Sequence, residues 1–188
     1  MALKASIYKV RLQLSDMDRG VYGEHLLTIA RHPSETDERM MMRVLAYALH
    51  TPADSERGTL ELAKSLWDTD EPDLWQKDLT GEIVRWIDVG QPDERRIMRA
   101  SPRAERVVVM SYASSTPVWW SNISSKISRA RNVAVWQIEA VHSLALAALA
   151  QRSMQLQISV QDGSLWVSDT TSTVEITPHA LRQVQGPV

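Results

Sequence analysis

The chain has 188 residues, a formal net charge of −2 at neutral pH and 23% charged residues, which is typical of one globular domain. It contains no cysteine, so disulfides, zinc knuckles and thiol nucleophiles are excluded. No apolar run is long enough to cross a bilayer, and the first residues lack the apolar core of a signal peptide. We therefore expect a cytoplasmic protein without a membrane partner, with a single domain over residues 1–182 and a flexible tail over 183–188.

A hairpin and a helix are the first predicted elements. Residues 5–14 alternate polar and apolar side chains, as a half-buried strand does, and residues 21–30 return as a second strand. Residues 34–49 predict a helix with Ser34 as its N-cap. The first turn of this helix would carry three acids, which the helix dipole favours there. These acids are Glu35, Asp37 and Glu38.

Three candidate strands and a second helix follow. The strands are residues 59–66, 72–79 and 82–89. A tight turn at Thr80 and Gly81 joins the last two into a hairpin. Pro92 then stands where a helix accepts proline, at its first position, and the helix should end before Pro102.

The rest of the chain predicts more strands alternating with helices, and then a hairpin. Residues 107–112 are continuously apolar, as expected of a strand covered on both faces. Helices are expected from Thr116 and over about 139–151. The remaining predicted strands are residues 132–138, 154–161, 164–168 and 173–176.

These elements predict an α/β fold with a mixed central sheet. Its order over residues 34–112 is helix, strand, strand, strand, helix, strand. The strands at 82–89, 107–112 and 132–138 should be parallel neighbours, because helices join them and such crossovers are right-handed. An N-terminal and a C-terminal β-hairpin would flank this sheet.

Two aspartates are expected to face each other across the hairpin. If Thr80 and Gly81 are the central turn residues, Asp73 pairs with Asp88, with Cβ atoms about 4.5–5.5 Å apart. Like charges directly opposite are destabilising, so the arrangement requires an explanation. Three remain open: a bound Mg²⁺ or Mn²⁺, a proton shared by the carboxylates, or a different register caused by a longer turn.

The segment after the second aspartate adds groups that favour an anion. Gly90 and Gln91 join the strand to the helix near Pro92, whose first backbone N–H groups favour a phosphate. Acidic ligands for a metal and donors for a phosphate together suit metal-assisted phosphodiester hydrolysis.

Several strings of residues resemble one known family. They are EPDLW at 71–75, DLTG at 78–81, WIDVGQPDE at 86–94, DRGVY at 18–22 and QDGSLW at 161–166. Over nearly the whole chain, the sequence resembles the YaeQ family of bacterial proteins. The resemblance implies a variant of the PD-(D/E)XK nuclease fold, whose core has the helix and strand order predicted above.

The resemblance also implies a set of site residues. Pro72 and Asp73 match the "PD" of the motif, and Asp88 matches its "D/E". Glu38 lies on the first helix, where the superfamily often has another acid, so the implied cation ligands are Asp73, Asp88 and Glu38. The lysine expected two residues after Asp88 is replaced by Gly90.

Loss of the lysine leaves two functional hypotheses. In the first, the protein is a metal-dependent nuclease acting on DNA or RNA, and Gln91 or Lys64 orients water or phosphate in place of the missing side chain. In the second, the fold persists as a non-catalytic binding or regulatory module. A cluster of arginines after the site is expected to form a solvated face. Its members are Arg95, Arg96, Arg99, Arg103 and Arg106.

Overall fold

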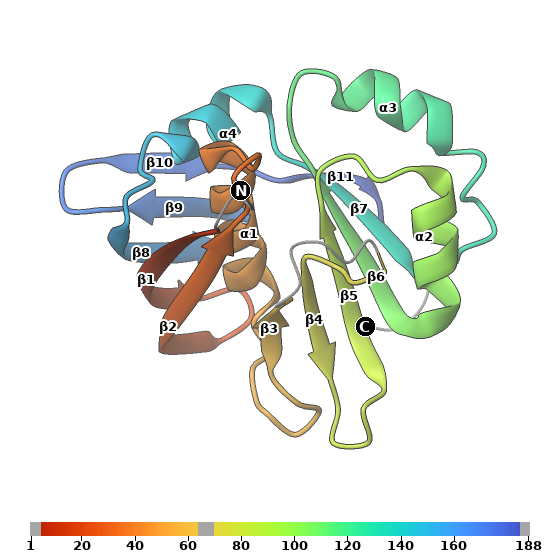
Figure 1. Ribbon diagram of the computed structural model, residues 1–188, viewed down its shortest axis with the longest axis horizontal. Helices are drawn as coiled ribbons and strands as arrows, with labels where there is room; N and C mark the ends of the chain where they lie inside the picture. Colours follow the sequence, from red (N-terminus) through yellow and green to blue (C-terminus); the bar gives the residue numbers. More distant parts are fainter. Residues whose placement is uncertain (1–4, 64–69, 185–188) are drawn as a thin grey trace.

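Two β-sheets and four α-helices make up the structure, a computed structural model that describes residues 5–63 and 70–184 (Figure 1). One sheet has five strands in the order β10-β9-β8-β1-β2, and the other has six in the order β11-β7-β6-β5-β4-β3. The predicted mixed α/β class is therefore confirmed, but the strands divide between two sheets, and the predicted hairpins do not stand apart as flanking elements.

The five-stranded sheet combines the two ends of the chain. Its strands are β1 (Ser6–Asp16), β2 (Val21–Arg31), β8 (Ser153–Gln161), β9 (Ser164–Ser168) and β10 (Thr173–Ile176). β1 pairs with β2 in antiparallel and with β8 in parallel orientation, so the N-terminal and C-terminal hairpins form one continuous sheet. Alternate residues of β1 and β8 are buried, which gives both strands one face for the same core.

The six-stranded sheet carries the predicted helix and strand order. Its strands are β3 (Leu60–Leu62), β4 (Leu74–Lys77), β5 (Ile83–Val89), β6 (Ala104–Ser111), β7 (Val133–Gln137) and β11 (His179–Arg182). β5, β6 and β7 are parallel neighbours, as predicted. β11, which the sequence did not predict, pairs antiparallel with β7 at the edge.

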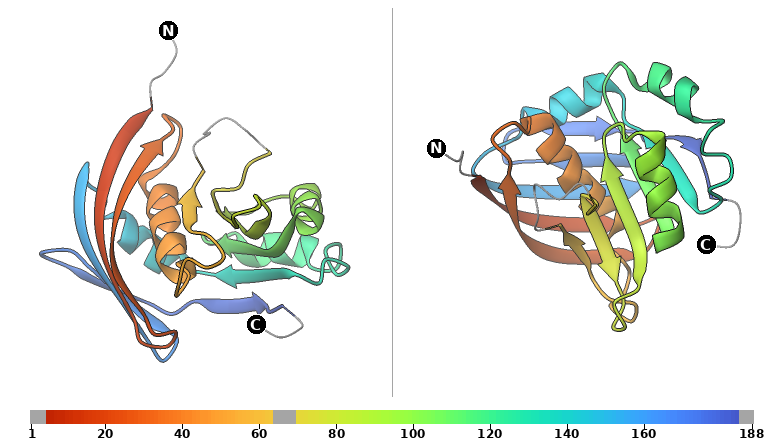
Figure 2. Two further views of the ribbon diagram at one scale, coloured as in Figure 1. Left: turned by 90° about the horizontal axis from the view of Figure 1, so that it is seen from below. Right: turned by 45° about the vertical axis from the view of Figure 1, so that its right-hand side comes forward.

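The six-stranded sheet has a hydrophobic layer on each face, and helices cover both layers. α1 (Asp37–His50) lies between the two sheets, and Met40, Met41 and Met42 are fully buried there (Figure 2). α4 (Ala140–Ala147) packs against α1. α2 (Glu94–Ala100) and α3 (Thr116–Ile123) cover the other face of the six-stranded sheet, where a short 3-10 helix (Ser101–Arg103) leads into β6.

Two helices begin later than the sequence predicted, because a different residue supplies the cap. The N-cap of α1 is Thr36, whose hydroxyl accepts a hydrogen bond from the Arg39 backbone N–H, and not Ser34. The N-cap of α2 is Asp93, whose carboxylate accepts from the Arg96 backbone N–H. Pro92 therefore precedes the helix.

Some predicted segments extend beyond the part of the chain that the structure describes. Residues 64–66 of the third predicted strand and residues 185–188 of the predicted tail lie outside the described residues. Within 5–63 and 70–184, no helix is both long and apolar enough to span a membrane.

Candidate functional site

The hairpin of β4 and β5 has the predicted register but a different turn. Leu74 pairs with Ile87 and Trp75 with Trp86, as predicted. The turn is longer than two residues, because the backbone N–H of Asp78 donates to the carbonyl of Glu82 at 3.0 Å. A register shift after Gln76 compensates for the extra length. The strand pairing ends with Leu74 and Ile87, next to the two aspartates, where the backbone N–H of Asp73 donates to the carbonyl of Ile87 at 3.0 Å.

Asp73 and Asp88 both line one cavity of about 540 Å³. The cavity lies where the N-terminal end of α1, the start of β4, the end of β5 and α2 meet. Among the described residues, the polar lining comprises four carboxylates, three guanidinium groups and three further side chains. These residues are Glu35, Glu71, Asp73, Asp88, Arg39, Arg43, Arg96, His32, Ser34 and Gln91.

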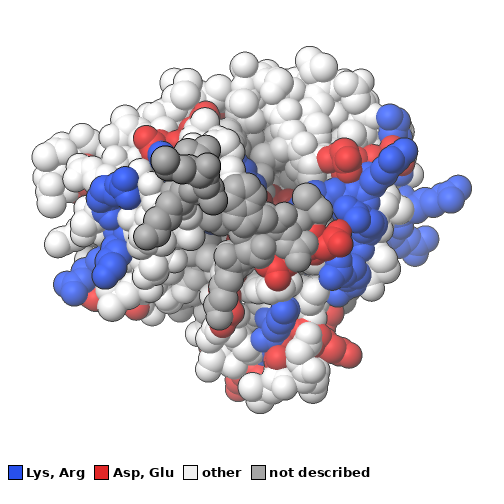
Figure 3. Space-filling model, in the orientation of Figure 1, with Lys and Arg blue, Asp and Glu red and all other residues white. Residues whose placement is uncertain are grey.

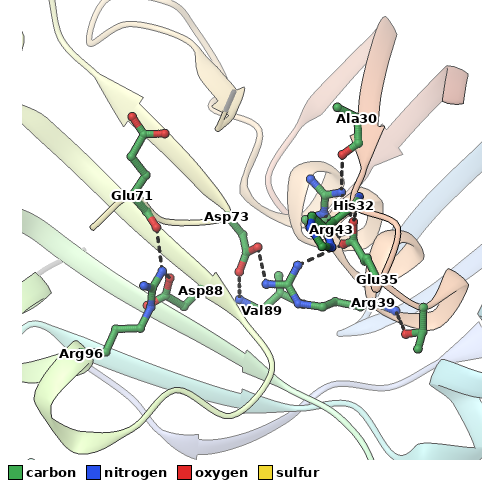
Figure 4. Close-up of polar contacts among 11 residues, drawn as sticks. Ala30, His32, Glu35, Arg39, Arg43, Glu71, Asp73, Asp88, Val89 and Arg96 are labelled. Carbon is green, nitrogen blue, oxygen red and sulfur yellow. Dashed lines mark hydrogen bonds and ion pairs between the residues drawn. The ribbon is translucent and has the colours of Figure 1, made fainter. Parts of the chain in front are cut away.

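Asp88 forms a two-pronged ion pair with Arg96 (Figure 4). Arg96 Nη2 donates to Asp88 Oδ1 at 2.7 Å, and Arg96 Nε donates to Oδ2 at 3.0 Å. The same Nη2 also donates to the carbonyl of Glu71 at 2.7 Å. The side chain of Asp88 is only 1% exposed, and this burial raises its pKa despite the opposing effect of Arg96.

Asp73 is held by the first helix and by its neighbouring strand. Arg39 Nη2 donates to Asp73 Oδ1 at 2.6 Å, and the Val89 backbone N–H donates to Oδ2 at 2.7 Å (Figure 4). Burial lowers the pKa of Arg39, but the charges of Asp73 and Glu35 outweigh that effect and leave the pKa raised. Arg39 is therefore a permanent cation at the edge of the cavity.

A second ion-pair cluster extends this contact into the core. Glu35 Oε1 accepts from Arg39 Nη1 at 3.0 Å and from Arg43 Nε at 2.9 Å, and its Oε2 accepts from Arg43 Nη2 at 2.8 Å. Arg43 also donates to the carbonyl of Ala30 at 3.2 Å. The charges therefore alternate along the path Asp73, Arg39, Glu35, Arg43.

The remaining predicted site residues have different surroundings. One carboxylate oxygen of Glu38 accepts from the Ser143 hydroxyl of α4 at 2.6 Å, and Glu38 is not among the described residues that line the cavity. Gln91 does line it, although its amide nitrogen donates to the carbonyl of Tyr112 and to the Ser115 hydroxyl, at the start of α3. Lys64 lies outside the described residues.

Sequence reasoning did not identify the arginines of the cavity. Basic side chains do gather near α2, and Arg99 and Arg103 are exposed there as expected (Figure 3). Arg96 departs from that expectation, because it reaches into the cavity with its side chain only 24% exposed. The four-residue spacing of Arg39 and Arg43 was a usable signal, since residues at this spacing share one helix face.

Comparison with known proteins now identifies the family. The family model described as "YaeQ protein" matches residues 1–178. The chain belongs to the YaeQ family. It is 40% identical to the YaeQ protein of Salmonella typhi and 39% identical to that of Escherichia coli K12, each over 184 residues that cover 97% of this chain and 99% of the relative.

Two solved YaeQ structures are also similar to this one. The crystal structure of YaeQ from Xanthomonas axonopodis pv. citri has a TM-score of 0.88 and 43% identity, over 96% of this chain and 99% of that one. The YaeQ protein from Pseudomonas syringae has a TM-score of 0.88 and 36% identity, over 97% and 98% of the two chains.

Gly90, at the position of the expected lysine, has a backbone conformation that favours glycine. Its φ is +108°, a value that strains other residues. We predict that Gly90→Lys lowers the free energy of unfolding by about 1–3 kcal/mol, measured by urea denaturation. Gly90→Ala should lose a similar amount, because an added Cβ would make only an ordinary van der Waals contact with the Tyr112 ring, at 4.0 Å, and the cost arises in the backbone. A fully stable Gly90→Lys variant would contradict this explanation.

Proposed function

We propose that Asp73 and Asp88 bind a divalent cation, Mg²⁺ or Mn²⁺, that serves phosphodiester chemistry on DNA or RNA. One observation carries the proposal: the two carboxylates, from neighbouring strand ends, line the same cavity as Arg39 and Arg96. Carboxylate oxygens are the ligands that Mg²⁺ and Mn²⁺ prefer, and guanidinium groups suit a phosphate. When bound, such a cation activates water and stabilises charge on the phosphoryl group.

The donor set suits a cation that keeps part of its water shell. Among the described residues, no group of three or more acidic or histidine side chains is placed to hold a metal. Mg²⁺ is commonly held by one or two carboxylates together with water and substrate phosphate. We therefore assign Asp73 and Asp88 as direct ligands, with any contribution of Glu38 passing through water.

Two other residues are candidates for orienting water or phosphate. Gln91 lines the cavity, which supports a role in orienting water or phosphate. Lys64 is the second candidate for that role.

The order of the helices and strands supports a nuclease-like core. This order is α1-β3-β4-β5-α2-β6, with β5 and β6 parallel, and it is the order that the PD-(D/E)XK resemblance implies.

The Asp88→Asn variant tests this function. We expect it to lose Mn²⁺ binding in calorimetric titration, because one ligand charge is removed, and to lose any cleavage of single- or double-stranded nucleic acid. Mn²⁺ at a hundred times its dissociation constant should stabilise the wild type by about 2.7 kcal/mol, and this effect should vanish in the variant. Asp70→Asn is the matched control, because Asp70 pairs with Arg99 on the surface. Unchanged Mn²⁺ binding in Asp88→Asn would refute the proposed ligand.

A non-catalytic binding or regulatory module is the second candidate. It is favoured by Gly90 at the lysine position and by the ion pairs that already neutralise Asp73 and Asp88. Under this alternative, the purified protein cleaves no nucleic acid with Mg²⁺ or Mn²⁺, and Asp88→Asn leaves partner binding intact. Metal-dependent cleavage that is lost in Asp88→Asn would exclude it.

A further inference from the structure

We propose that Arg39 and Arg96 exchange partners during ligand binding. They neutralise Asp73 and Asp88 in the structure described above, and they bind the phosphate of the ligand once a divalent cation occupies the two aspartates. The ligand of the cavity is then a cation and a phosphate ester bound together. This inference rests on the proposed function, and it assigns to two arginines the phosphate contacts that the missing lysine cannot make.

The three arginines of the cavity differ in their freedom to move. The side chain of Arg43 is 4% exposed and is fixed by Glu35 and the carbonyl of Ala30. The side chains of Arg39 and Arg96 are 38% and 24% exposed. Arg39 also donates to Glu35, and Arg96 to the carbonyl of Glu71, so each keeps one of its contacts when it turns away from an aspartate. Because both side chains are partly exposed, this turn does not require space inside the core, whereas Arg43 is enclosed.

Each mobile arginine competes with a cation for the same carboxylate. Arg96 contacts both oxygens of Asp88, and Arg39 contacts Asp73 Oδ1 at 2.6 Å. A Mg²⁺ ion would lie about 2.0–2.1 Å from its oxygen ligands, so it would meet the positive guanidinium charge at close range. Cation binding therefore favours a rotation of both guanidinium groups away from the aspartates.

A phosphate is a suitable new partner for the displaced groups. The planar guanidinium fork matches phosphate oxygens, and such charge-assisted pairs are among the stronger hydrogen bonds in proteins. Arg39 comes from α1 and Arg96 from α2, so the two approach Asp73 and Asp88 from opposite sides (Figure 4). A phosphate on the cation would thus be contacted from both sides.

The charges of the cavity predict that the two ligands bind better together than alone. Among the described residues that line it, four carboxylates and three guanidinium groups give a formal net charge of −1. A phosphate alone meets these carboxylates, and a divalent cation alone must displace two arginines from the carboxylates that they neutralise. The pair satisfies both sets of charges, so the affinities are coupled, and the coupling is reciprocal.

Calorimetric titration of the full chain with Mn²⁺, with and without inorganic phosphate, measures this coupling. We expect phosphate to tighten Mn²⁺ binding by about tenfold or more. Phosphate in solution itself binds some Mn²⁺, which weakens the apparent affinity, so tightening cannot arise from that side reaction.

Three variants assign the coupling to residues. Arg96→Gln and Arg39→Gln should bind Mn²⁺ at least as tightly as the wild type without phosphate, because a competitor is removed, and should lose the effect of phosphate. Arg99→Gln is the matched control, since it removes the same charge from α2 at an exposed position that pairs with Asp70. Thermal unfolding of each variant checks that the fold is retained.

The outcomes separate this inference from the function on which it rests. Tightening by phosphate that survives in Arg99→Gln and disappears in Arg96→Gln and Arg39→Gln supports the partner exchange. Mn²⁺ binding that is lost in Asp88→Asn but unaffected by phosphate overturns the exchange and leaves the cation site standing. No Mn²⁺ binding to the wild type under either condition overturns both.

Discussion

Replacing Arg43 with methionine should lower the free energy of unfolding by about 3–5 kcal/mol. The side chains of Arg43 and Glu35 are each 4% exposed, so the variant leaves a buried carboxylate with Arg39 as its remaining charged partner. Burying a charge without its partner is costly, because the interior solvates it far less well than water does. Urea denaturation followed by circular dichroism measures the loss.

A double variant shows whether the loss of the Glu35–Arg43 ion pair is the cause. Arg43→Met combined with Glu35→Gln removes both charges, and we expect it to regain a substantial part of the lost stability. If Arg43→Met instead costs less than about 1 kcal/mol, then Glu35 is solvated or neutralised by another route, and the buried pair does not stabilise the fold as predicted.

Local sequence patterns were sufficient to predict most of the strands of this fold. Alternation identified β1, and the continuous apolar run identified β6. The register of β4 and β5 was predicted correctly for a partly wrong reason. The loop is longer than a two-residue turn at Thr80 and Gly81, but the shift after Gln76 restores the pairing that such a turn would produce.

The division into two sheets depends on contacts between distant parts of the chain. β1 pairs with β8 in parallel orientation, and more than a hundred residues separate the two strands in sequence. No turn specifies such a pairing. It follows from which apolar faces pack together around α1, and the composition and periodicity of single segments do not encode that choice.

The candidate site shows a similar limit. Sequence reasoning recognised that Asp73 and Asp88 would repel each other, and it considered a cation, a shared proton or a different register. The structure uses another solution, in which Arg39 and Arg96 each neutralise one aspartate. These arginines come from two helices on opposite sides of the strands, so their meeting with the aspartates depends on tertiary packing that spacing along the chain does not reveal.

Lowering the pH from 7 to 5 should cost about 2 kcal/mol of stability through His50 alone. Burial and, to a smaller extent, the charges of Arg85, Arg19 and Arg106 together lower the pKa of His50 to about 3. In the unfolded chain the histidine titrates near pH 6.5, so below that value the unfolded state binds a proton that the folded state does not. The stabilising contribution is therefore complete above about pH 6.5 and decreases as the pH falls toward 3, by about 1.4 kcal/mol per unit.

Urea denaturation at pH 7 and pH 5 measures the difference in stability between the two pH values. His50→Gln should reduce this difference by about 2 kcal/mol. His179→Gln, on an exposed edge strand, should not. Asp88 acts in the opposite direction, because its raised pKa favours the folded state as the pH falls, and it contributes equally to all three proteins. If His50→Gln is too unstable to compare, proton NMR of the wild-type ring decides the question, and a His50 signal that titrates near pH 6.5 would contradict the prediction.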